Sequence, residues 1–236
     1  MARSRFEDIV NVIGQRIAGG EMKPSDTLTL AEIEAEFNCS RTVAREVQRN
    51  LEECGFVIAQ RRRGLIVQEK SEWDVFNPRV IRWRLTGPQS DLQIRSLIDL
   101  RQAIEPVAAN LAAQFASRDQ RDEILKVGCE LVELGAVSSG AEFMDADIRF
   151  HTLILESTGN EMFAALAPAI AAVLKWRTDE SLMPPHPEPR AMRDHESTAR
   201  AIYSGNGKVA EEAMRDIVDE VRIAFDTRAP NILRFD

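Results

Sequence analysis

The sequence is poor in the residues that would support disulfides, zinc fingers or a membrane span. It contains three cysteines, at positions 39, 54 and 129, and no two of them have zinc-finger spacing. An odd number of widely separated cysteines argues against a disulfide framework. No run of about 18 apolar residues occurs, and the N-terminal stretch MARSRFEDIVNVIG carries acidic residues where a signal peptide has an apolar core. We therefore expect a cytoplasmic protein with free thiols and no membrane partner.

Positive charge is also scarce, because 30 Lys and Arg face 38 Asp and Glu, which gives a net charge of −8. The deficit is unevenly distributed. Residues 1–70 hold 11 basic and 11 acidic residues, so residues 71–236 carry the whole net charge. Residues 39–70 hold 7 basic and 4 acidic residues. Because contact with phosphates depends on local charge, this basic segment remains a candidate nucleic-acid surface.

Length and composition fit a folded protein. The chain has 236 residues, of which 44% are hydrophobic and 29% are charged. These values are ordinary for a globular protein with a real core, built as one large or two small domains.

The first 70 residues contain three predicted helices in close succession. Apolar residues at helical spacing predict the first two over residues 5–18 and 30–37. Thr29 precedes the second helix and Glu32 occupies its third position, which is the pattern of a capping box. Ser40 can cap the third helix. The second and third helices have the spacing of a helix-turn-helix.

The third helix presents two distinct faces. Three apolar residues recur at steps of four: Val43, Val47 and Leu51. Three arginines recur at the same step on a neighbouring face: Arg41, Arg45 and Arg49. Guanidinium groups in such a row can bond guanine edges or phosphates in the major groove of DNA. The same row also occurs on the solvated face of an ordinary amphipathic helix.

A basic hairpin follows and favours the DNA interpretation. Two short β-like runs at residues 57–60 and 65–68 are joined by Arg61-Arg62-Arg63-Gly64. The residues predicted to contact DNA come from the caps of the second and third helices, the third helix itself and the hairpin: Thr29, Ser40, Arg41, Thr42, Arg45, Arg49, Arg61, Arg62, Arg63 and Gly64.

The run PSDTLTLAEIEAEFNCSRTVAREVQRNLEECGFVIAQRRRGLIV resembles the winged-helix head of GntR-type bacterial transcription regulators. The resemblance implies that Arg41 and Arg45 contact the operator, with Arg49 as a further candidate. It implies that Gly64 lets the wing approach the minor groove. It also implies a homodimer that reads an inverted repeat in double-stranded DNA.

Residues 71–90 are too apolar for a free linker, since they include Trp73 and Trp83. A short helix is expected over residues 78–85, and it packs on one or both domains. This junction could couple the two domains or simply fill the space between them.

From residue 91 onward every periodic segment is helical. The expected helices are residues 92–116, 118–137, 141–157, 160–182, 188–204 and 207–226. Pro106 and Pro168 lie inside two of them and are expected to kink them. The expected fold class is mainly α, with a winged helix-turn-helix domain over residues 1–70 and an antiparallel helical bundle over residues 91–230.

Asp147 and His151 lie four residues apart on one helical face. A carboxylate and an imidazole at this spacing can hold one metal ion, clamp one polar ligand or form a buried hydrogen-bonded pair. Arg101 and Arg222 lie on the first and last bundle helices. Each would be costly to bury without an anion, and each could equally form a salt bridge.

The bundle segment, residues 92–226, resembles the FCD effector domain of the FadR-like branch of the same family. The matching motifs are LRQAIEPVAANLAA, DADIRFHTLILESTGN and DHESTARAI. The resemblance implies one divalent metal, zinc or similar, on Asp147, His151 and His195, and no organic cofactor. Ile217 occupies the usual fourth-ligand position in AMRDI, so water or the effector must complete the site.

The junction WDVFNPRVIRWRL and the missing fourth histidine resemble regulators of gluconate and galactonate operons. The implied effector is a sugar acid, and its expected contacts are Arg101, Asp147, His151, Trp176, His195 and Arg222. The expected function is a repressor released by this effector. Three alternatives remain: a metal-dependent lyase or hydrolase acting on a sugar acid, a regulator of another organic acid such as lactate, and a DNA-bound structural protein. No nucleophile, phosphate loop or cofactor fingerprint accompanies the metal-type residues.

Overall fold

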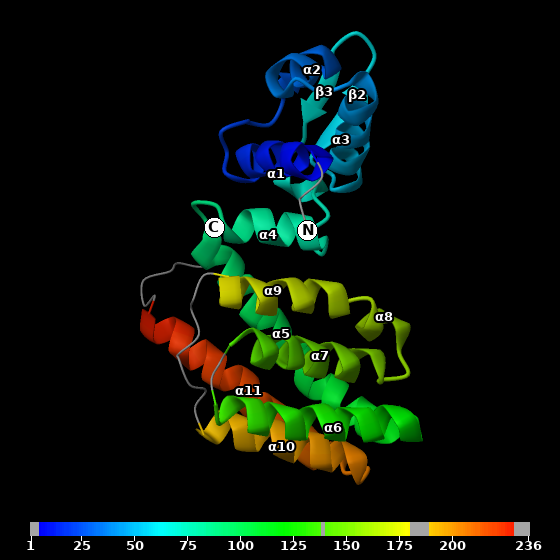
Figure 1. Cartoon of the computed structure of the whole chain (residues 1–236), viewed down its shortest axis with the longest axis vertical. Helices are drawn as coiled ribbons and strands as arrows, with labels where there is room; N and C mark the ends of the chain where they lie inside the picture. Colours follow the sequence, from blue (N-terminus) through cyan, green and yellow to red (C-terminus); the bar gives the residue numbers. More distant parts are fainter. Residues whose placement is uncertain (1–4, 138–139, 180–188, 229–236) are drawn as a thin grey trace. The chain divides into compact units, whose positions relative to one another are not determined.

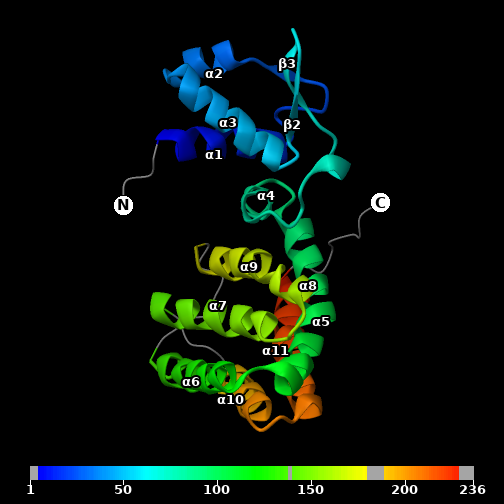
Figure 2. The ribbon, with the colours of Figure 1, turned by 90° about the vertical axis from the view of Figure 1, so that its right-hand side faces the viewer.

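The computed structural model describes residues 5–137, 140–179 and 189–228. The chain divides into two compact units, Met1–Ser90 and Asp91–Asp236, which we call the head and the body (Figure 1 and Figure 2). The head therefore includes the whole apolar junction, residues 71–90, which the sequence predicts to pack on one or both domains.

The head contains four α-helices, one short 3-10 helix and a small sheet. Its helices are α1 Arg5–Ala18, α2 Leu30–Phe37, α3 Arg41–Glu53, η1 Lys70–Glu72 and α4 Pro78–Leu85. Its strands are β1 Thr27–Leu28, β2 Val57–Gln60 and β3 Gly64–Val67. The strands are antiparallel in the order β1-β3-β2, with Ile58 opposite Ile66. The predicted winged helix-turn-helix is confirmed, whereas β1, only two residues long, was not predicted.

The junction helix α4 packs against α1 within the head. Trp83 is fully buried, and its Nε1 donates to Asn11 Oδ1 over 3.0 Å. Gly14 allows this contact, since a Cβ there would lie 2.5 Å from the indole ring. Phe56 lies between the rings of Trp73 and Trp83, at centroid distances of 4.5 and 5.2 Å. This aromatic core holds α4 to the head.

The body is a helical bundle, as predicted. Its helices are α5 Ser90–Phe115, α6 Arg118–Gly135, α7 Ala141–Glu156, α8 Glu161–Ala164, α9 Ala167–Asp179, α10 Pro189–Tyr203 and α11 Gly207–Arg228. Figure 1 and Figure 2 show α9, α7 and α6 stacked with similar axes, while α5 and α11 run across them. No helix among the described residues is long and apolar enough to cross a membrane.

One predicted helix is wrong. A single helix kinked at Pro168 was predicted over residues 160–182, but the described part of this segment forms two helices, α8 and α9, and residues 180–182 lie outside the described residues. Pro168 is the second residue of α9, where its missing N–H breaks no intrahelical hydrogen bond. Pro106, in contrast, lies inside α5, which continues through it.

Candidate functional site

The predicted recognition helix α3 exposes its three arginines. Ser40 caps it by accepting a hydrogen bond from the Val43 backbone N–H over 3.3 Å. The buried face is formed by Ala44, Val47 and Leu51. Val43 is half-buried and packs against the same core, so the predicted apolar face is confirmed and Ala44 extends it. Arg41, Arg45, Arg49 and Thr42 are exposed.

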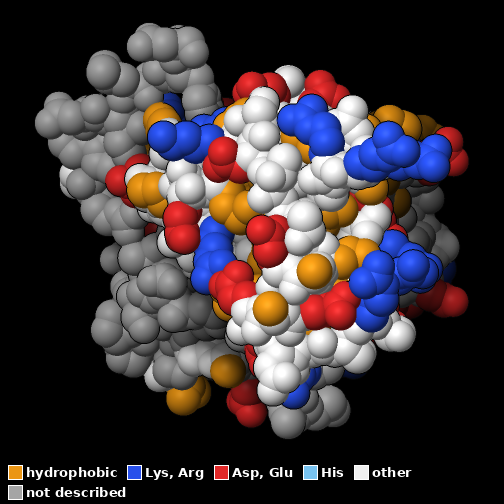
Figure 3. All heavy atoms as spheres, turned by 90° about the horizontal axis from the view of Figure 1, so that it is seen from above, with side chains coloured by type: hydrophobic (Ala, Val, Ile, Leu, Met, Phe, Trp, Pro, Cys, Tyr) orange, Lys and Arg blue, Asp and Glu red, His pale blue; other side chains and the backbone are white. Residues whose placement is uncertain are grey.

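Two further features shape the face around α3. Arg41 Nη1 lies 3.3 Å from Glu34 Oε1 on α2, which restrains this arginine. Arg45 and Arg49 line a hollow of about 290 Å³ together with Leu30 and Gln48. Figure 3 views the head from the end that carries α2 and the hairpin, and shows Lys and Arg side chains in several separate groups.

The hairpin tip is basic and has an unusual backbone. Arg61, Arg62 and Arg63 are all exposed, and Arg62 has a φ of 67°. Gly64 has a φ of 89°, and a Cβ there would lie 2.9 Å from the Leu28 carbonyl oxygen. Both facts explain why glycine stands at this position. Thr29 is the N-cap of α2, and its hydroxyl is engaged with Glu32 in the predicted capping box.

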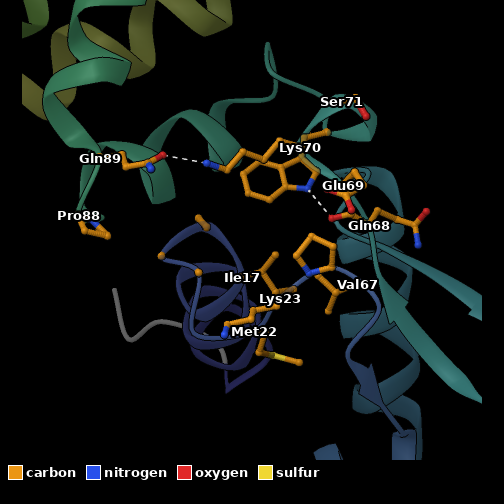
Figure 4. A pocket seen from close by; sticks show the side chains of 15 residues that line it. Ile17, Met22, Lys23, Val67, Gln68, Glu69, Lys70, Ser71, Pro88 and Gln89 are labelled. Atoms are coloured by element: carbon orange, nitrogen blue, oxygen red, sulfur yellow. Dashed lines mark hydrogen bonds between the residues drawn. The ribbon is translucent and has the colours of Figure 1, made fainter. Parts of the chain in front are cut away.

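A second hollow in the head lies away from these arginines. Figure 4 shows this cavity of about 490 Å³, whose walls include Ile17, Met22 and Val67. At its rim Lys70 Nζ donates to Gln89 Oε1 over 2.9 Å. Its lining shares no residue with the hollow beside α3, and its charged residues are Lys23, Glu69 and Lys70.

The body contains a buried polar cluster contributed by three helices. We call these five residues the polar cluster: Arg101 and Glu105 from α5, Asp147 and His151 from α7, and His195 from α10. All are buried, with Arg101 and His151 each only 1% exposed. The i, i+4 spacing of Asp147 and His151 places both on one face of α7. Helix α6 packs against both α7 and α10, and α10 carries His195.

Short contacts connect the cluster. Glu105 accepts from Arg101 Nε over 2.6 Å and from Nη2 over 3.1 Å, and lies 2.8 Å from His151 Nδ1. Asp147 Oδ1 lies 3.5 Å from His151 Nε2 and 3.2 Å from His195 Nε2. Nη1 of Arg101 is buried and has no hydrogen-bond partner among the described residues. The cluster thus contains one cationic donor that is free to bind an anion.

The two imidazoles differ in what surrounds their ring nitrogens. His195 Nδ1 lies 2.6 Å from the Ala191 carbonyl oxygen, which can only accept, so this nitrogen carries a proton. His151 Nδ1 lies 2.8 Å from the Glu105 carboxylate, a distance suited to an ion pair, but it forms no aligned hydrogen bond with any described residue. Nε2 of each ring faces Asp147 Oδ1, and Nε2 of His151 also lies 3.5 Å from Arg101 Nη2.

Electrostatics keep both carboxyl groups ionised. Burial alone would raise the pKa of Glu105, but Arg101 and His151 outweigh it and lower the pKa to about 2. Burial likewise opposes ionisation of Asp147, yet hydrogen bonds from the two histidines hold its pKa well below the usual range. Burial disfavours the charged form of His151, but Glu105 and Asp147 raise its pKa overall. The metal-free cluster therefore favours a protonated His151.

The same atoms fit a divalent metal ion. Asp147, His151 and His195 offer ligand atoms that all lie within 4.8 Å of one another. In tetrahedral zinc sites with bonds of about 2.0–2.1 Å, ligand atoms are about 3.3 Å apart, close to the two distances from Asp147. Ile217 is 4% exposed and belongs to the apolar core, so it supplies no fourth ligand. A metal here would keep an open coordination position.

The other predicted effector contacts lie elsewhere or are not described. Arg222 Nη1 bonds Asp226 Oδ2 over 2.8 Å with a side chain 42% exposed, as in a surface salt bridge. Trp176 lies in α9, and its side chain is outside the described residues. Glu105 was missed from the sequence, although its i, i+4 spacing from Arg101 could have identified it as the partner of that arginine.

Comparison with known proteins agrees with both halves of this description. The model of the bacterial regulatory proteins of the gntR family matches residues 6–67, and the FCD domain model matches residues 96–220. The chain belongs to the GntR family, with an FCD domain. This GntR regulator is therefore a DNA-binding transcription regulator, as the sequence resemblance implied.

Individual relatives extend the comparison. This GntR regulator is 28% identical over 221 residues to the galactonate operon transcriptional repressor of Escherichia coli (strain K12). The aligned region covers 90% of this chain and 93% of that repressor. The chain is 27% identical over 205 residues to the HTH-type transcriptional regulator LutR of Bacillus subtilis (strain 168), covering 84% and 90%. A solved structure of Lar, which controls the Listeria monocytogenes agr system, matches with a TM-score of 0.57 at 15% identity, covering 97% and 99%. The last comparison supports the fold.

Proposed function

We propose that this GntR regulator is a homodimeric repressor of a sugar-acid catabolic operon, released from its operator by an aldonate such as galactonate or gluconate. The buried polar cluster carries this proposal, because the unpartnered Nη1 of Arg101 lies in the same cluster as a metal-type triad. The similarity to the galactonate operon repressor of Escherichia coli supports the same effector class.

Within the body, Arg101 would bind the effector carboxylate. Its Nη1 is buried without a partner, and satisfying a buried cationic donor with an anion removes a substantial desolvation cost. A divalent metal on Asp147, His151 and His195 would supply Lewis-acid positions for carboxylate and hydroxyl oxygens. His195 and His151 are already oriented for this role by Ala191 and Glu105.

Within the head, the arginines of α3 would read the major groove. Arg41, Arg45 and Arg49 are exposed on one helix, and bidentate arginine contacts to guanine are the commonest base-specific contacts. The hairpin residues 61–64 would follow the neighbouring backbone or minor groove. One head offers little contact area with DNA, so tight binding favours a dimer whose two heads bind an inverted repeat. We place this regulator in the cytoplasm.

Release by effector requires a difference in affinity. The sugar acid must bind a second arrangement of the dimer more tightly than the arrangement that fits the operator. Operator DNA must then weaken sugar-acid binding by the same factor as the sugar acid weakens operator binding. We propose no catalytic role for the polar cluster, because both of its carboxylates are engaged by arginine or histidine.

Calorimetry with metal-loaded protein tests the effector site. Galactonate, gluconate and lactate are titrated into the wild type and into the matched variants Arg101→Lys and Arg222→Lys. An aldonate should bind the wild type and Arg222→Lys, and should bind Arg101→Lys at least about ten-fold more weakly, since lysine cannot replace the guanidinium fork.

Three outcomes would contradict the proposal. Loss of binding only in Arg222→Lys would move the carboxylate site to α11. Binding of lactate alone would replace the effector class. Turnover of any sugar acid by the pure protein would revive the enzyme hypothesis.

A further inference from the structure

Strand β2 is an edge strand with an outward-facing amide. The sheet order β1-β3-β2 leaves one side of β2 without a strand partner. Gln68 N donates to Phe56 O, and antiparallel pairs alternate between those that exchange hydrogen bonds and those that do not. Ala59, paired with Leu65, therefore belongs to a pair that does not, so its N–H points away from β3.

The outward amide of Ala59 is bound by the recognition helix. Glu52 Oε1, near the end of α3, accepts from Ala59 N over 3.0 Å. Gln48 Nε2 donates to both oxygens of the same Glu52 carboxylate, at 3.4 and 3.3 Å. Gln48 also lines the hollow formed by Arg45 and Arg49. One carboxylate thus joins the recognition helix to the wing.

We propose that Glu52 is a positioning residue that fixes the wing against α3, so that the arginines of the helix and of the hairpin tip meet DNA together. The inference rests on the proposed operator binding. It concerns how the two basic elements are held in register, since β2 leads directly into Arg61.

The sign of the effect separates this role from simple electrostatics. Glu52 is an acid within the DNA-binding head, so its charge alone repels phosphates. Removing the charge should strengthen binding if Glu52 has no structural role. If Glu52 holds the wing against α3, removing the Glu52 side chain should weaken DNA binding. The wing would then be ordered only on binding, and the free energy of ordering it would reduce the affinity.

The test compares three variants of the full chain. The DNA probe is a duplex that the wild type selects from a random-sequence pool. Glu52→Ala should bind about five- to ten-fold more weakly, whereas Glu52→Gln, which keeps an oxygen acceptor for Ala59, should stay within about two-fold of the wild type. Glu53→Ala removes the same charge from an exposed neighbouring residue and should bind as well as the wild type or better.

The salt dependence and the wing arginines identify the mechanism. Glu52→Ala should show a shallower slope of log affinity against log salt, because the wing makes fewer phosphate contacts. Introduced into a protein whose hairpin arginines 61–63 are already alanine, Glu52→Ala should have almost no further effect. A Glu52→Ala protein that binds DNA as tightly as Glu53→Ala would overturn the proposal.

A measurement without DNA distinguishes the inference from the proposed function. The Ala59 amide should be protected from hydrogen exchange in the wild type and in Glu52→Gln, and should lose protection in Glu52→Ala. Unchanged protection would overturn the inference even if operator binding is correct. If instead Arg45→Ala left DNA binding intact, the proposed operator contact would fail, whatever the exchange result.

Discussion

Glu105→Ala should be one of the most damaging single substitutions in the body. It removes the carboxylate that bonds Arg101 at 2.6 and 3.1 Å and faces His151 at 2.8 Å, and both charged partners of the ion pair are at most 2% exposed. A buried guanidinium group would remain without compensation. Breaking a buried pair in this way costs about 3–5 kcal/mol of the free energy of unfolding, a large part of a typical domain's stability.

The magnitude depends on burial, so a surface pair is the control. Glu196 and Arg200 form an i, i+4 ion pair on α10 at 2.7 Å, but their side chains are 35% and 62% exposed. Glu196→Ala should leave stability nearly unchanged, because solvent screens an exposed pair.

A double variant tests the physical reason. Arg101→Met with Glu105→Leu removes both charges and keeps apolar volume, so it should cost less than Glu105→Ala alone. All variants are compared by urea unfolding of metal-free protein, followed by far-UV circular dichroism. The reasoning would be refuted if Glu105→Ala and Glu196→Ala had similar midpoints, or if the double variant lost more stability than the single one.

Three further predictions follow from the packing and titration of single residues. The Glu105 carboxyl has a pKa of about 2 in the folded protein against an ordinary value of 4.5. The ionised carboxyl therefore stabilises the fold fully above pH 4.5, and this stabilisation is lost as the pH falls toward 2. Glu105→Gln should flatten this part of a profile of melting temperature against pH measured without metal. Gly14→Val should destabilise the head by about 1–3 kcal/mol and alter tryptophan fluorescence, because its Cβ would meet the Trp83 ring; an unchanged melting curve would contradict the α1–α4 packing. Burial raises the pKa of the Cys54 thiol to about 11, so a thiol reagent at pH 8 should modify the half-buried Cys39 and Cys129 before Cys54, and equal rates for all three would contradict the burial of Cys54.

The local sequence was sufficient for most of the fold. Helices α1, α2 and α4 have the predicted bounds, because apolar spacing and cap residues such as Thr29 act within a few residues. Strand β1 was missed because two residues carry no periodic pattern and its pairing with β3 is a tertiary contact. The break between α8 and α9 was missed because Pro168 was treated as a kink inside a helix, although it is equally suited to a helix start.

The candidate site was only partly accessible from the sequence. Asp147 and His151 were identified by spacing within one helix, and His195 by family resemblance. Glu105 required the structure, because its value to the cluster comes from facing His151, 46 residues later in the chain and on another helix. The link between Glu52 and Ala59 was equally hidden, since a hydrogen bond from a helix to an edge strand leaves no pattern in the sequence.

The central claim is that a sugar acid controls DNA binding by this chain, and one competition experiment tests it directly. The full-length, metal-loaded protein is bound to the duplex it selects from a random pool, and galactonate, gluconate and lactate are titrated while fluorescence anisotropy follows the DNA. The account predicts an enriched inverted repeat that an aldonate releases from the wild type, while Arg101→Lys stays bound at the same concentration. The account would be contradicted if no aldonate released the selected DNA, or if no sequence were enriched from the pool.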